Sequence, residues 1–514
     1  MNTTGHRTDK TDQIDKKTIL VAIADLFFYT KVRDALRQPE YHLEKARTQQ
    51  DIVNKALSAN PGLILFNMND PTLNAFQALE ELKADPRLKS IPTLAFANHE
   101  EIDTWNRAKA LGVTKIVSRN EFSARTRDLV EEVMSARPQQ SPPTATPNEK
   151  PTKRSRLHGQ HAQLGAAFED LAGWEIPAHY GDVAAEHRAV RRAVGIADLS
   201  HRGKLRVTGE DRLKWLQSVI SNDILPLQPG QGLYSSLLTH KGKMLTYFRL
   251  YMQTEAVMLE DVGEIGGTTF QALRKFLLYG TKAKMENCAE TWGLLLISGP
   301  KAPHVVQSAF GVDVMDLKPV DFVTAQIGGH HALVLRTEET GEIDIEVLLP
   351  ADSLLPAWTS AMQAGNKFGM RTIGSHAREA LRIEAGLPKA GTELNEEIVP
   401  PEANLEGKAF SLNKGCYPGQ EVVARMDTYG NVRRKLVGLA LRDLGVPPHG
   451  AKLYSGDREV GWISSAVRSP LLNKTIALGF PLRDFSKPGT ELAVEFEGGR
   501  HPATVQTLPF YTKH

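Results

Sequence analysis

The octapeptide KGCYPGQE, at residues 414–421, places one of only two cysteines in a short loop together with a lysine and a glutamate. Its two glycines allow backbone conformations and close approaches that other residues avoid, and its proline stiffens the turn. A thiol flanked by Lys414 and by unpaired amides is expected to favour the thiolate, which is the nucleophilic and metal-binding form. The alternative is that Cys416 is a small, buried and inert apolar side chain.

These residues also carry a resemblance to a known family. KGCYPGQE, followed by VVAR, resembles the signature K-G-C-Y-x-G-Q-E of the YgfZ-type folate-binding proteins, relatives of the glycine-cleavage T-protein. The resemblance implies a tetrahydrofolate-binding fold, iron-sulfur client or assembly proteins as partners and, in bacteria, a link to tRNA modification. It makes Cys416 and Lys414 candidates for the chemistry, and Gln420 and Glu421 candidates for folate contacts.

The resemblance to T-proteins covers roughly the last two thirds of the chain. GIADLSHRG at residues 195–203 and GQGLYSSLL at residues 230–238 are similar to the amino-terminal half of that family. The second of these segments contains Tyr234, which is a further candidate for a folate contact.

A glutamate for the folate ring is also implied by the resemblance. In TGEIDIEV, at residues 340–347, Glu346 lies where the family uses a glutamate to hold the pterin. A carboxylate suits this role because it can accept two donors from an amino-pyrimidinone edge. Glu342 or Asp344 would take the role if the register slipped by two residues.

REALRIEAG, at residues 378–386, resembles the R-x-E-x-G segment of the family. Arg382 is therefore the candidate for binding a carboxylate or carbonyl group of folate. The alternative is that Arg382 and Glu384 form an ordinary surface pair on a helix.

One departure from the family bears on catalysis. T-proteins that transfer the aminomethyl carbon carry an aspartate in the strand after a Gly-rich hairpin, which here is THKGK at residues 239–243. Thr246 and Tyr247 occupy the positions of the acidic residues. Neither side chain contains a carboxyl group, so neither can supply the negative charge near neutral pH. This favours a YgfZ-type maintenance factor. A one-carbon transferase and a non-catalytic folate-binding scaffold are the alternatives.

Residues 18–135 contain five strand-helix repeats, which predict an α/β domain of the (βα)5 type with helices on both faces of a parallel sheet. The segment resembles the receiver domain of bacterial response regulators but departs from it at each functional position. Residues 23–24, where receivers hold an acidic pair, are Ile-Ala, the phospho-acceptor position holds Asn67, and the hydroxyl and lysine positions hold Ala97 and Arg119. Asp70 falls in the turn. We therefore expect a phosphorylation-silent docking or dimerisation module, with a small-molecule sensor as the alternative.

The C-terminal segment is rich in alternating or β-branched runs, at residues 436–441, 452–454, 460–464, 475–480 and 491–496. This spacing predicts a small antiparallel barrel that ends an α+β T-protein-like body. We expect five parts: a disordered tail (1–16), a pseudo-receiver domain (17–136), a Pro-rich linker (137–160), a folate-binding region (161–432) and the barrel (433–514).

Composition restricts the class of protein. The chain has 514 residues, two cysteines and a net charge of +2, which predicts several domains, no disulfide framework and no overall attraction to nucleic acid. It lacks an apolar leader and any run long enough to cross a membrane, so we expect a cytoplasmic protein. Two cysteines cannot supply a four-thiolate site, so no bound metal or cluster is predicted.

Overall fold

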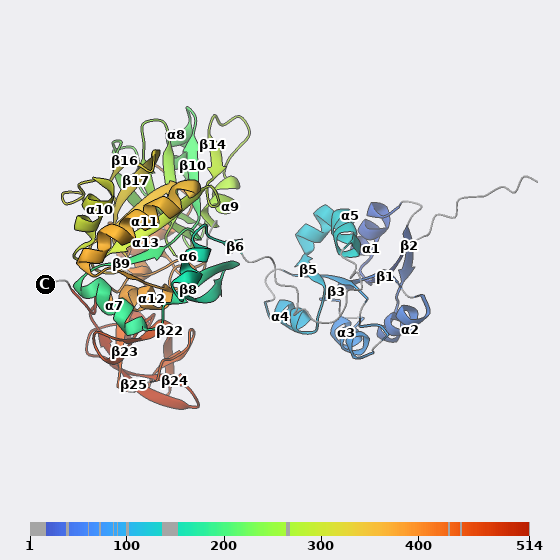
Figure 1. Cartoon of the computed structure of the whole chain (residues 1–514). Helices are drawn as coiled ribbons and strands as arrows, with labels where there is room; N and C mark the ends of the chain where they lie inside the picture. Colours follow the sequence, from blue (N-terminus) through green and yellow to red (C-terminus); the bar gives the residue numbers. More distant parts are fainter. Residues whose placement is uncertain are drawn as a thin grey trace, which may run out of the picture. The chain divides into compact units, whose positions relative to one another are not determined.

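The structure is a computed structural model that describes residues 17–37, 41–59, 61–70, 73–85, 87–89, 91–98, 102–135, 153–263, 268–429, 432–442 and 445–512. The chain divides into two compact units, Met1–Pro147 and Asn148–His514 (Figure 1). The expected tail at residues 1–16 and most of the expected linker lie outside the described residues. Within the described residues, no helix is long and apolar enough to span a membrane.

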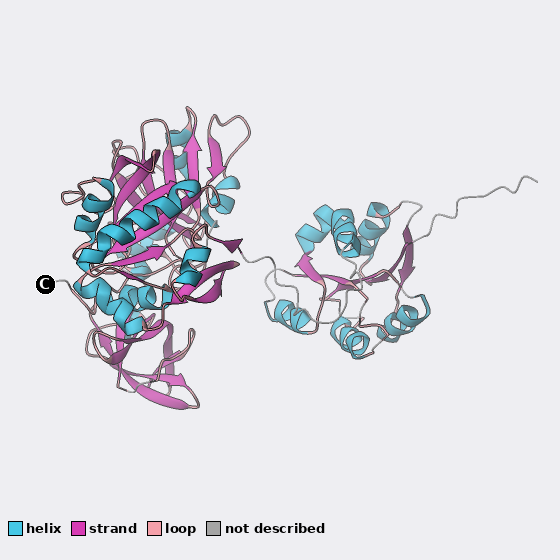
Figure 2. Cartoon of the chain, in the orientation of Figure 1, coloured by secondary structure: helices cyan, strands magenta, loops and turns pink. Residues whose placement is uncertain are grey.

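The N-terminal unit is a five-stranded parallel sheet in the order β2-β1-β3-β4-β5, with helices on both of its faces (Figure 2). Side chains alternate along β1, so Leu20 belongs to the core under α2 and α3, and Val21 belongs to the core under α1 and α5. The expected alternation of strands and helices is present. The elements are β1 (Lys17–Ala22), α1 (Leu26–Ala35), β2 (Tyr41–Lys45), α2 (Gln49–Ala59), β3 (Leu63–Asn67), α3 (Ala75–Ala84), β4 (Thr93–Ala97), α4 (Ile102–Ala110), β5 (Lys115–Ser118) and α5 (Arg119–Ser135).

The second unit contains a five-stranded antiparallel sheet in the order β11-β12-β13-β10-β14. Along β12, Phe248 and Leu250 pack under the outer helices, whereas Tyr247 and Tyr251 face the central core. Its strands are β10 (Lys204–Thr208), β11 (Gly232–Leu238), β12 (Met244–Met252), β13 (Val257–Asp261) and β14 (Lys284–Asn287), and its outer helices are α8 (Arg212–Val219) and α9 (Thr268–Arg274).

A six-stranded sheet in the order β16-β17-β18-β15-β9-β19 faces the first. Along β15, Leu294 and Leu296 belong to the shared central core, and Leu295 and Ile297 pack under α10 and α11. Its elements are β9 (Gly195–Asp198), β15 (Trp292–Ser298), β16 (Phe322–Ile327), β17 (His330–Thr337), β18 (Asp344–Pro350), β19 (Arg371–Thr372), α10 (Ala302–Phe310) and α11 (Leu354–Gly365).

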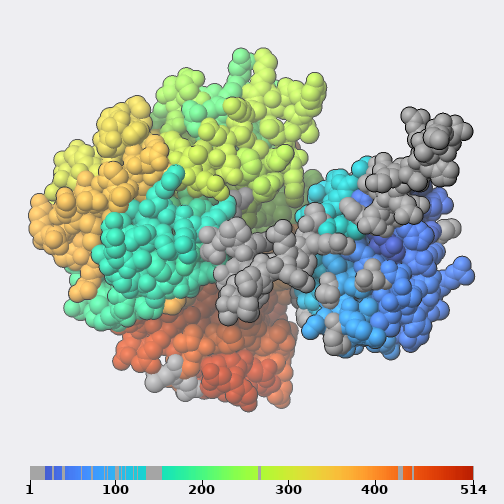
Figure 3. All heavy atoms as spheres, turned by 45° about the vertical axis from the view of Figure 1, so that its right-hand side comes forward, coloured from blue at the N-terminus to red at the C-terminus, as the bar shows by residue number. Residues whose placement is uncertain are grey.

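Six strands close the barrel that was expected at the C-terminus, in the order β20-β23-β22-β21-β24-β25. The barrel forms one continuous surface with the rest of its unit (Figure 3). Its strands are β20 (Val437–Leu441), β21 (Lys452–Ser455), β22 (Arg458–Ser469), β23 (Lys474–Gly479), β24 (Glu491–Phe496) and β25 (Gly499–Gln506). The sequence did not predict β25, because its glycine, proline and charged residues hide the strand pattern.

Residues 153–160, expected as the end of the linker, belong to the second unit instead. Lys153–Arg154 form β6, which adds to a small sheet with β7 (Ala167–Leu171) and β8 (Trp174–His179). Ion pairs hold this strand, from Lys153 to Glu290 at 2.6 Å and from Arg154 to Glu175 at 2.5 Å. The remaining helices of this unit are α6 (His158–Gln163), α7 (Val183–Arg192), α12 (Ser375–Glu384) and α13 (Gln420–Tyr429), with short 3-10 turns at Ala351–Ser353, Asn366–Phe368, Pro400–Ala403 and Arg483–Phe485.

Candidate functional site

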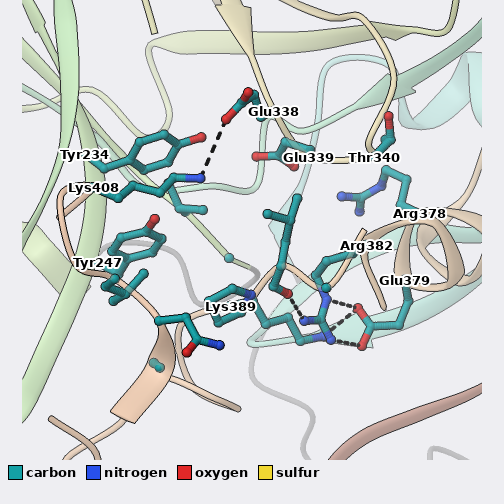
Figure 4. Close-up of a pocket in the computed structure, with 18 of the residues that line it drawn as sticks. Tyr234, Tyr247, Glu338, Glu339, Thr340, Arg378, Glu379, Arg382, Lys389 and Lys408 are labelled. Atoms are coloured by element: carbon teal, nitrogen blue, oxygen red, sulfur yellow. Dashed lines mark hydrogen bonds and ion pairs between the residues drawn. The ribbon is translucent and has the colours of Figure 1, made fainter. Parts of the chain in front are cut away.

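A cavity lies between the inner faces of the two sheets and encloses about 870 Å³ of empty space, part of it open to solvent. Its walls come from β11, β12, β15, the loop between β17 and β18, helix α12 and the segment that follows α12 (Figure 4). The residues that line it include Arg202, Tyr234, Tyr247, Leu296, Glu338, Glu339, Arg378, Glu379, Arg382, Lys389 and Lys408.

One wall of the cavity is aromatic. Tyr234 and Tyr247 stack with their ring centroids 5.5 Å apart and an angle of 12° between the ring planes. Both rings are buried in the sheet, and burial raises the pKa of both phenols, so the hydroxyls stay protonated at neutral pH. Together with Leu296, they give the cavity a flat, largely apolar surface that suits a planar ring.

Two adjacent carboxylates form the second wall, and each has a cationic partner. Glu338 lies 3.6 Å from the Lys408 ammonium, which also lies 4.4 Å from the centre of the Tyr234 ring (Figure 4). Glu339 accepts two parallel hydrogen bonds of 2.7 Å from Arg202 and one of 3.0 Å from Arg249. Burial opposes the charge on Glu339, but the two arginines outweigh it and lower the pKa of this carboxyl to about 2.

The base of the cavity rests on a buried ionic network. The Arg249 NH2 group contacts Glu260 at 2.8 Å, Glu339 at 3.0 Å and both oxygens of Glu346 at 2.8 and 3.0 Å. Arg249, Glu260 and Glu346 have no exposed surface. Burial raises the pKa of Glu346 well above its ordinary value, even though Arg249 opposes the shift. The strands of the two sheets are therefore tied together directly behind the cavity.

Helix α12 closes one end of the cavity with Arg378 and Arg382. The Arg382 guanidinium donates to Glu379 at 2.9 and 2.7 Å, to Glu393 at 3.1 Å and to the Ser465 hydroxyl of the barrel at 2.9 Å. The predicted position of Arg382 beside the ligand space is found, but its hydrogen bonds give it a second role, which is to join the helix to the barrel. Arg382 therefore does not form the surface pair with Glu384 that was the alternative.

The structure does not bring the other predicted folate contacts to this cavity. Glu346 lies behind Arg249 and is absent from the lining. The Gln420 amide donates to the Lys414 carbonyl at 3.2 Å, which closes the cysteine loop on itself. Glu421 is exposed and forms a helical pair with Arg425. All three side chains have partners within the protein, and their role as folate contacts stays a prediction.

The Lys414 side chain also has a different role from the one expected. Its ammonium donates to the carbonyls of Gln217 at 2.5 Å, Ile220 at 2.6 Å and Asn222 at 3.2 Å, at the C-terminal end of α8. These contacts hold the loop to the body. Cys416 itself is exposed, which excludes the buried alternative.

Two glycines fix the cysteine loop against the hairpin at residues 239–243. A Cβ on Gly419, whose φ is +81°, would lie 2.4 Å from the Thr239 carbonyl oxygen and 2.8 Å from the Gly242 Cα. Only glycine permits this approach of the two backbones. The exposed thiol is therefore held next to the hairpin that precedes β12, the strand that carries Tyr247 into the cavity.

Thr246 and Tyr247, which stand at the positions where the resemblance places acidic residues, have different surroundings. Tyr247 lines the cavity, whereas Thr246 is buried and its hydroxyl has no hydrogen-bond partner among the described residues. Neither side chain can act as a carboxylate. The described residues also contain no group of three or more His, Cys, Asp or Glu arranged to hold a metal ion.

In the N-terminal unit, Asn67 ends β3 and is buried. Asp70 accepts a hydrogen bond of 2.8 Å from the Ala24 amide and so ties the loop after β3 to the end of β1. Asn69 makes an equivalent tie to the Asn98 amide at 2.7 Å. Pro71, which follows Asp70 directly, lies outside the described residues.

Two facing, largely antiparallel sheets with a cavity between them, followed by a six-stranded barrel, define the class as a T-protein-like fold. Residues 157–414 match the GCVT N-terminal domain, and residues 434–512 match the glycine cleavage T-protein C-terminal barrel domain. The chain belongs to the glycine cleavage T-protein family, which is a family of tetrahydrofolate-binding proteins.

Individual relatives agree with this assignment. The chain is 32% identical over 362 residues to an aminomethyltransferase of Bacillus subtilis (strain 168), covering 70% of this chain and 99% of the relative. It is 32% identical over 363 residues to an aminomethyltransferase of Chlorobium luteolum, covering 70% and 98%. The crystal structure of aminomethyltransferase T from Bartonella henselae superimposes with a TM-score of 0.64 at 25% identity, covering 70% of this chain and 98% of that one.

Proposed function

We propose that this chain binds tetrahydrofolate in the cavity between its two sheets and uses the Cys416 loop to support the assembly or repair of iron-sulfur proteins. The observation that carries the folate part is the cavity itself. It combines a flat wall of stacked tyrosines with anchored carboxylates on one side and arginines on α12 at one end. A ring with N–H donors and a carboxylate-bearing tail complements that distribution.

The Cys416 loop supports the second part of the proposal. Cys416 is exposed, whereas the other cysteine, Cys288, is buried. The loop is held by Lys414 and Gly419 against backbone of the cavity-bearing body. An exposed thiol on a fixed loop is accessible to a partner protein and is suited to redox or transfer chemistry on a client.

Folate-dependent transfer of a one-carbon group is the second candidate function, because the chain is similar to aminomethyltransferases of Bacillus subtilis and Chlorobium luteolum. Tyr247 argues against it. A phenol whose pKa is raised by burial is neutral at pH 7 and cannot stabilise a cationic methylene-folate as a carboxylate would.

For the N-terminal unit we propose a receiver-like docking module that does not accept phosphate. Asn67 stands at the expected acceptor position and cannot form an acyl phosphate. Treatment with acetyl phosphate and Mg²⁺ should leave the unit unmodified, and an acid-labile phosphate detected by mass spectrometry would contradict this.

Calorimetric titration of tetrahydrofolate into the full chain tests the folate part. We expect saturable binding with one site per chain. Rescue of iron-sulfur enzyme activity in cells that lack the endogenous factor tests the second part, and we expect it to depend on Cys416.

A further inference from the structure

The carboxylate that the family resemblance assigns to the pterin is closed to ligands in this chain. Glu346 has no exposed surface, and the Arg249 NH2 group contacts both of its oxygens at 2.8 and 3.0 Å. The Thr337 hydroxyl donates to it at 3.3 Å. A guanidinium and an amino-pyrimidinone edge both present N–H donors to a carboxylate, so Arg249 and a pterin compete for Glu346.

The Arg249 guanidinium cannot move away from Glu346 without losing its other hydrogen bonds. The same NH2 group contacts Glu260 at 2.8 Å and Glu339 at 3.0 Å, so moving the guanidinium would take a short hydrogen bond from three carboxylates at once. Breaking a buried ion pair from one side is strongly destabilising because the remaining charge loses its partner. The deep end of the cavity is therefore closed by the protein's own side chain.

Glu339 lies one step nearer to the cavity and is part of its lining. Arg202, which also lines the cavity, donates two hydrogen bonds of 2.7 Å to the Glu339 carboxylate, and the Oε2 atom receives one of these. A carboxylate oxygen accepts two hydrogen bonds, so Oε2, which accepts this one bond from the part of the chain that the structure describes, can take a second donor. In the view of Figure 4 the Glu339 carboxylate lies between the Tyr234 ring and the Arg378 guanidinium, and all three residues line the cavity.

We propose that Glu339, and not Glu346, receives the N–H donor edge of the ligand ring and thereby determines ring specificity. This inference rests on the proposed folate function and names the residue that recognises the ring. Arg249 acts as a positioning residue, because it fixes the Glu339 carboxylate and does not line the cavity itself. Arg202 also fixes this carboxylate, and it belongs to the cavity lining. The site should accept rings that carry N–H donors on one edge and reject rings that lack them.

Two ligands and two variants of the full chain test the proposal by calorimetry. The ligands are tetrahydrofolate and its analogue without the 2-amino group. The wild type should bind tetrahydrofolate at least about 10-fold more tightly than the analogue, since a site built to hydrogen-bond a donor rejects a ligand without it. Glu339→Gln should lose most of this preference, and Glu346→Gln should keep it, with folding of both variants checked by circular dichroism.

Loss of the preference in Glu346→Gln with retention in Glu339→Gln would overturn the proposal, and so would a wild type that binds both ligands equally. Failure of the wild type to bind either ligand would instead contradict the folate function itself. Since either variant can fail to fold, the crystal structure of the wild type with tetrahydrofolate is the second measurement. We expect the Arg249–Glu346 contacts to be intact and the ring edge to lie on Glu339, and displacement of Arg249 by the ring would refute the inference.

Discussion

The guanidinium of Arg249, on one sheet, contacts both carboxylate oxygens of Glu346, on the facing sheet, at 2.8 and 3.0 Å. Neither residue has any exposed surface. The pair therefore acts as a buried clamp between the sheets, and the ligand cavity opens directly above it.

Replacing Glu346 by Ala should destabilise the second unit by about 1–3 kcal/mol, because it leaves buried guanidinium N–H donors of Arg249 without this acceptor. The measurement is the free energy of unfolding in urea, followed by tryptophan fluorescence. Glu421→Ala is the matched control, since that glutamate is exposed and pairs only on the helix surface. Equal stability of the two variants would show that the clamp contributes nothing.

The close approach of the cysteine loop and the hairpin predicts a strong difference between two glycines. Gly419→Ala should lower stability by more than about 1 kcal/mol, because of its positive φ and the clash with the Thr239 carbonyl. Gly415→Ala is the control, since nothing lies within 4 Å of its Cβ position. Thermal unfolding of both variants checks this, and a harmless Gly419→Ala would contradict the described contact.

Lys414→Met should destabilise the chain by about 2 kcal/mol, since three carbonyls at the end of α8 lose a charged donor. It should leave the rate of Cys416 alkylation by iodoacetamide within about 2-fold of the wild type. Peptide mass spectrometry separates this thiol from the buried Cys288. A large fall in the alkylation rate would restore the activating role that the sequence suggested for Lys414.

The lowered pKa of the buried Asp198 carboxyl leads us to expect a loss of folding stability at acid pH. Burial alone would raise the pKa of Asp198, but hydrogen bonds from His161 and Ser200 lower it to about 2, below its ordinary value of 3.8. A lowered pKa means stability that is present above pH 4 and is lost as the pH falls towards 2. Between pH 5 and 2 the wild type should lose on the order of 1–2 kcal/mol more than Asp198→Asn. The exposed control Asp352→Asn should follow the wild type, and parallel curves for all three proteins would rule out the contribution of Asp198.

Cys416→Ser should leave tetrahydrofolate affinity within about 2-fold of the wild type, because the thiol does not line the cavity. The same variant should lose rescue of iron-sulfur enzyme activity in cells. Cys288→Ser is the paired control and should retain rescue if it is expressed at the wild-type level. Full rescue by Cys416→Ser would remove the proposed role of the thiol.

The sequence predicted the layers of this fold because they depend on local patterns. The β-branched runs of the N-terminal unit gave its parallel sheet, and alternation gave five of the six barrel strands. The first strand of the second unit was missed at Lys153, because only its pairing with Trp174 and Glu175 of β8 makes it a strand.

The candidate site was harder to predict because contacts across the fold decide it. Tyr234 and Arg382 were identified from family motifs and do line the cavity. Glu338, Glu339 and Lys408 were missed, since their importance comes from the arginines and tyrosines that face them. The two adjacent glutamates directly before TGEIDIEV were the one available signal. Glu346 does not line the cavity, and no sequence pattern shows that Arg249 covers it.

The most direct test of the account is a calorimetric titration of tetrahydrofolate into the wild type and Tyr234→Leu. Removing one of the two stacked rings should weaken binding by about 10-fold or more, since stacking on an aromatic side chain contributes roughly 1–3 kcal/mol per ring. Tyr279→Leu, which alters a fully exposed tyrosine, should bind like the wild type. Saturable binding that only Tyr234→Leu weakens would support the cavity as the folate site. A well-folded wild type that releases no heat and shows no binding would contradict it.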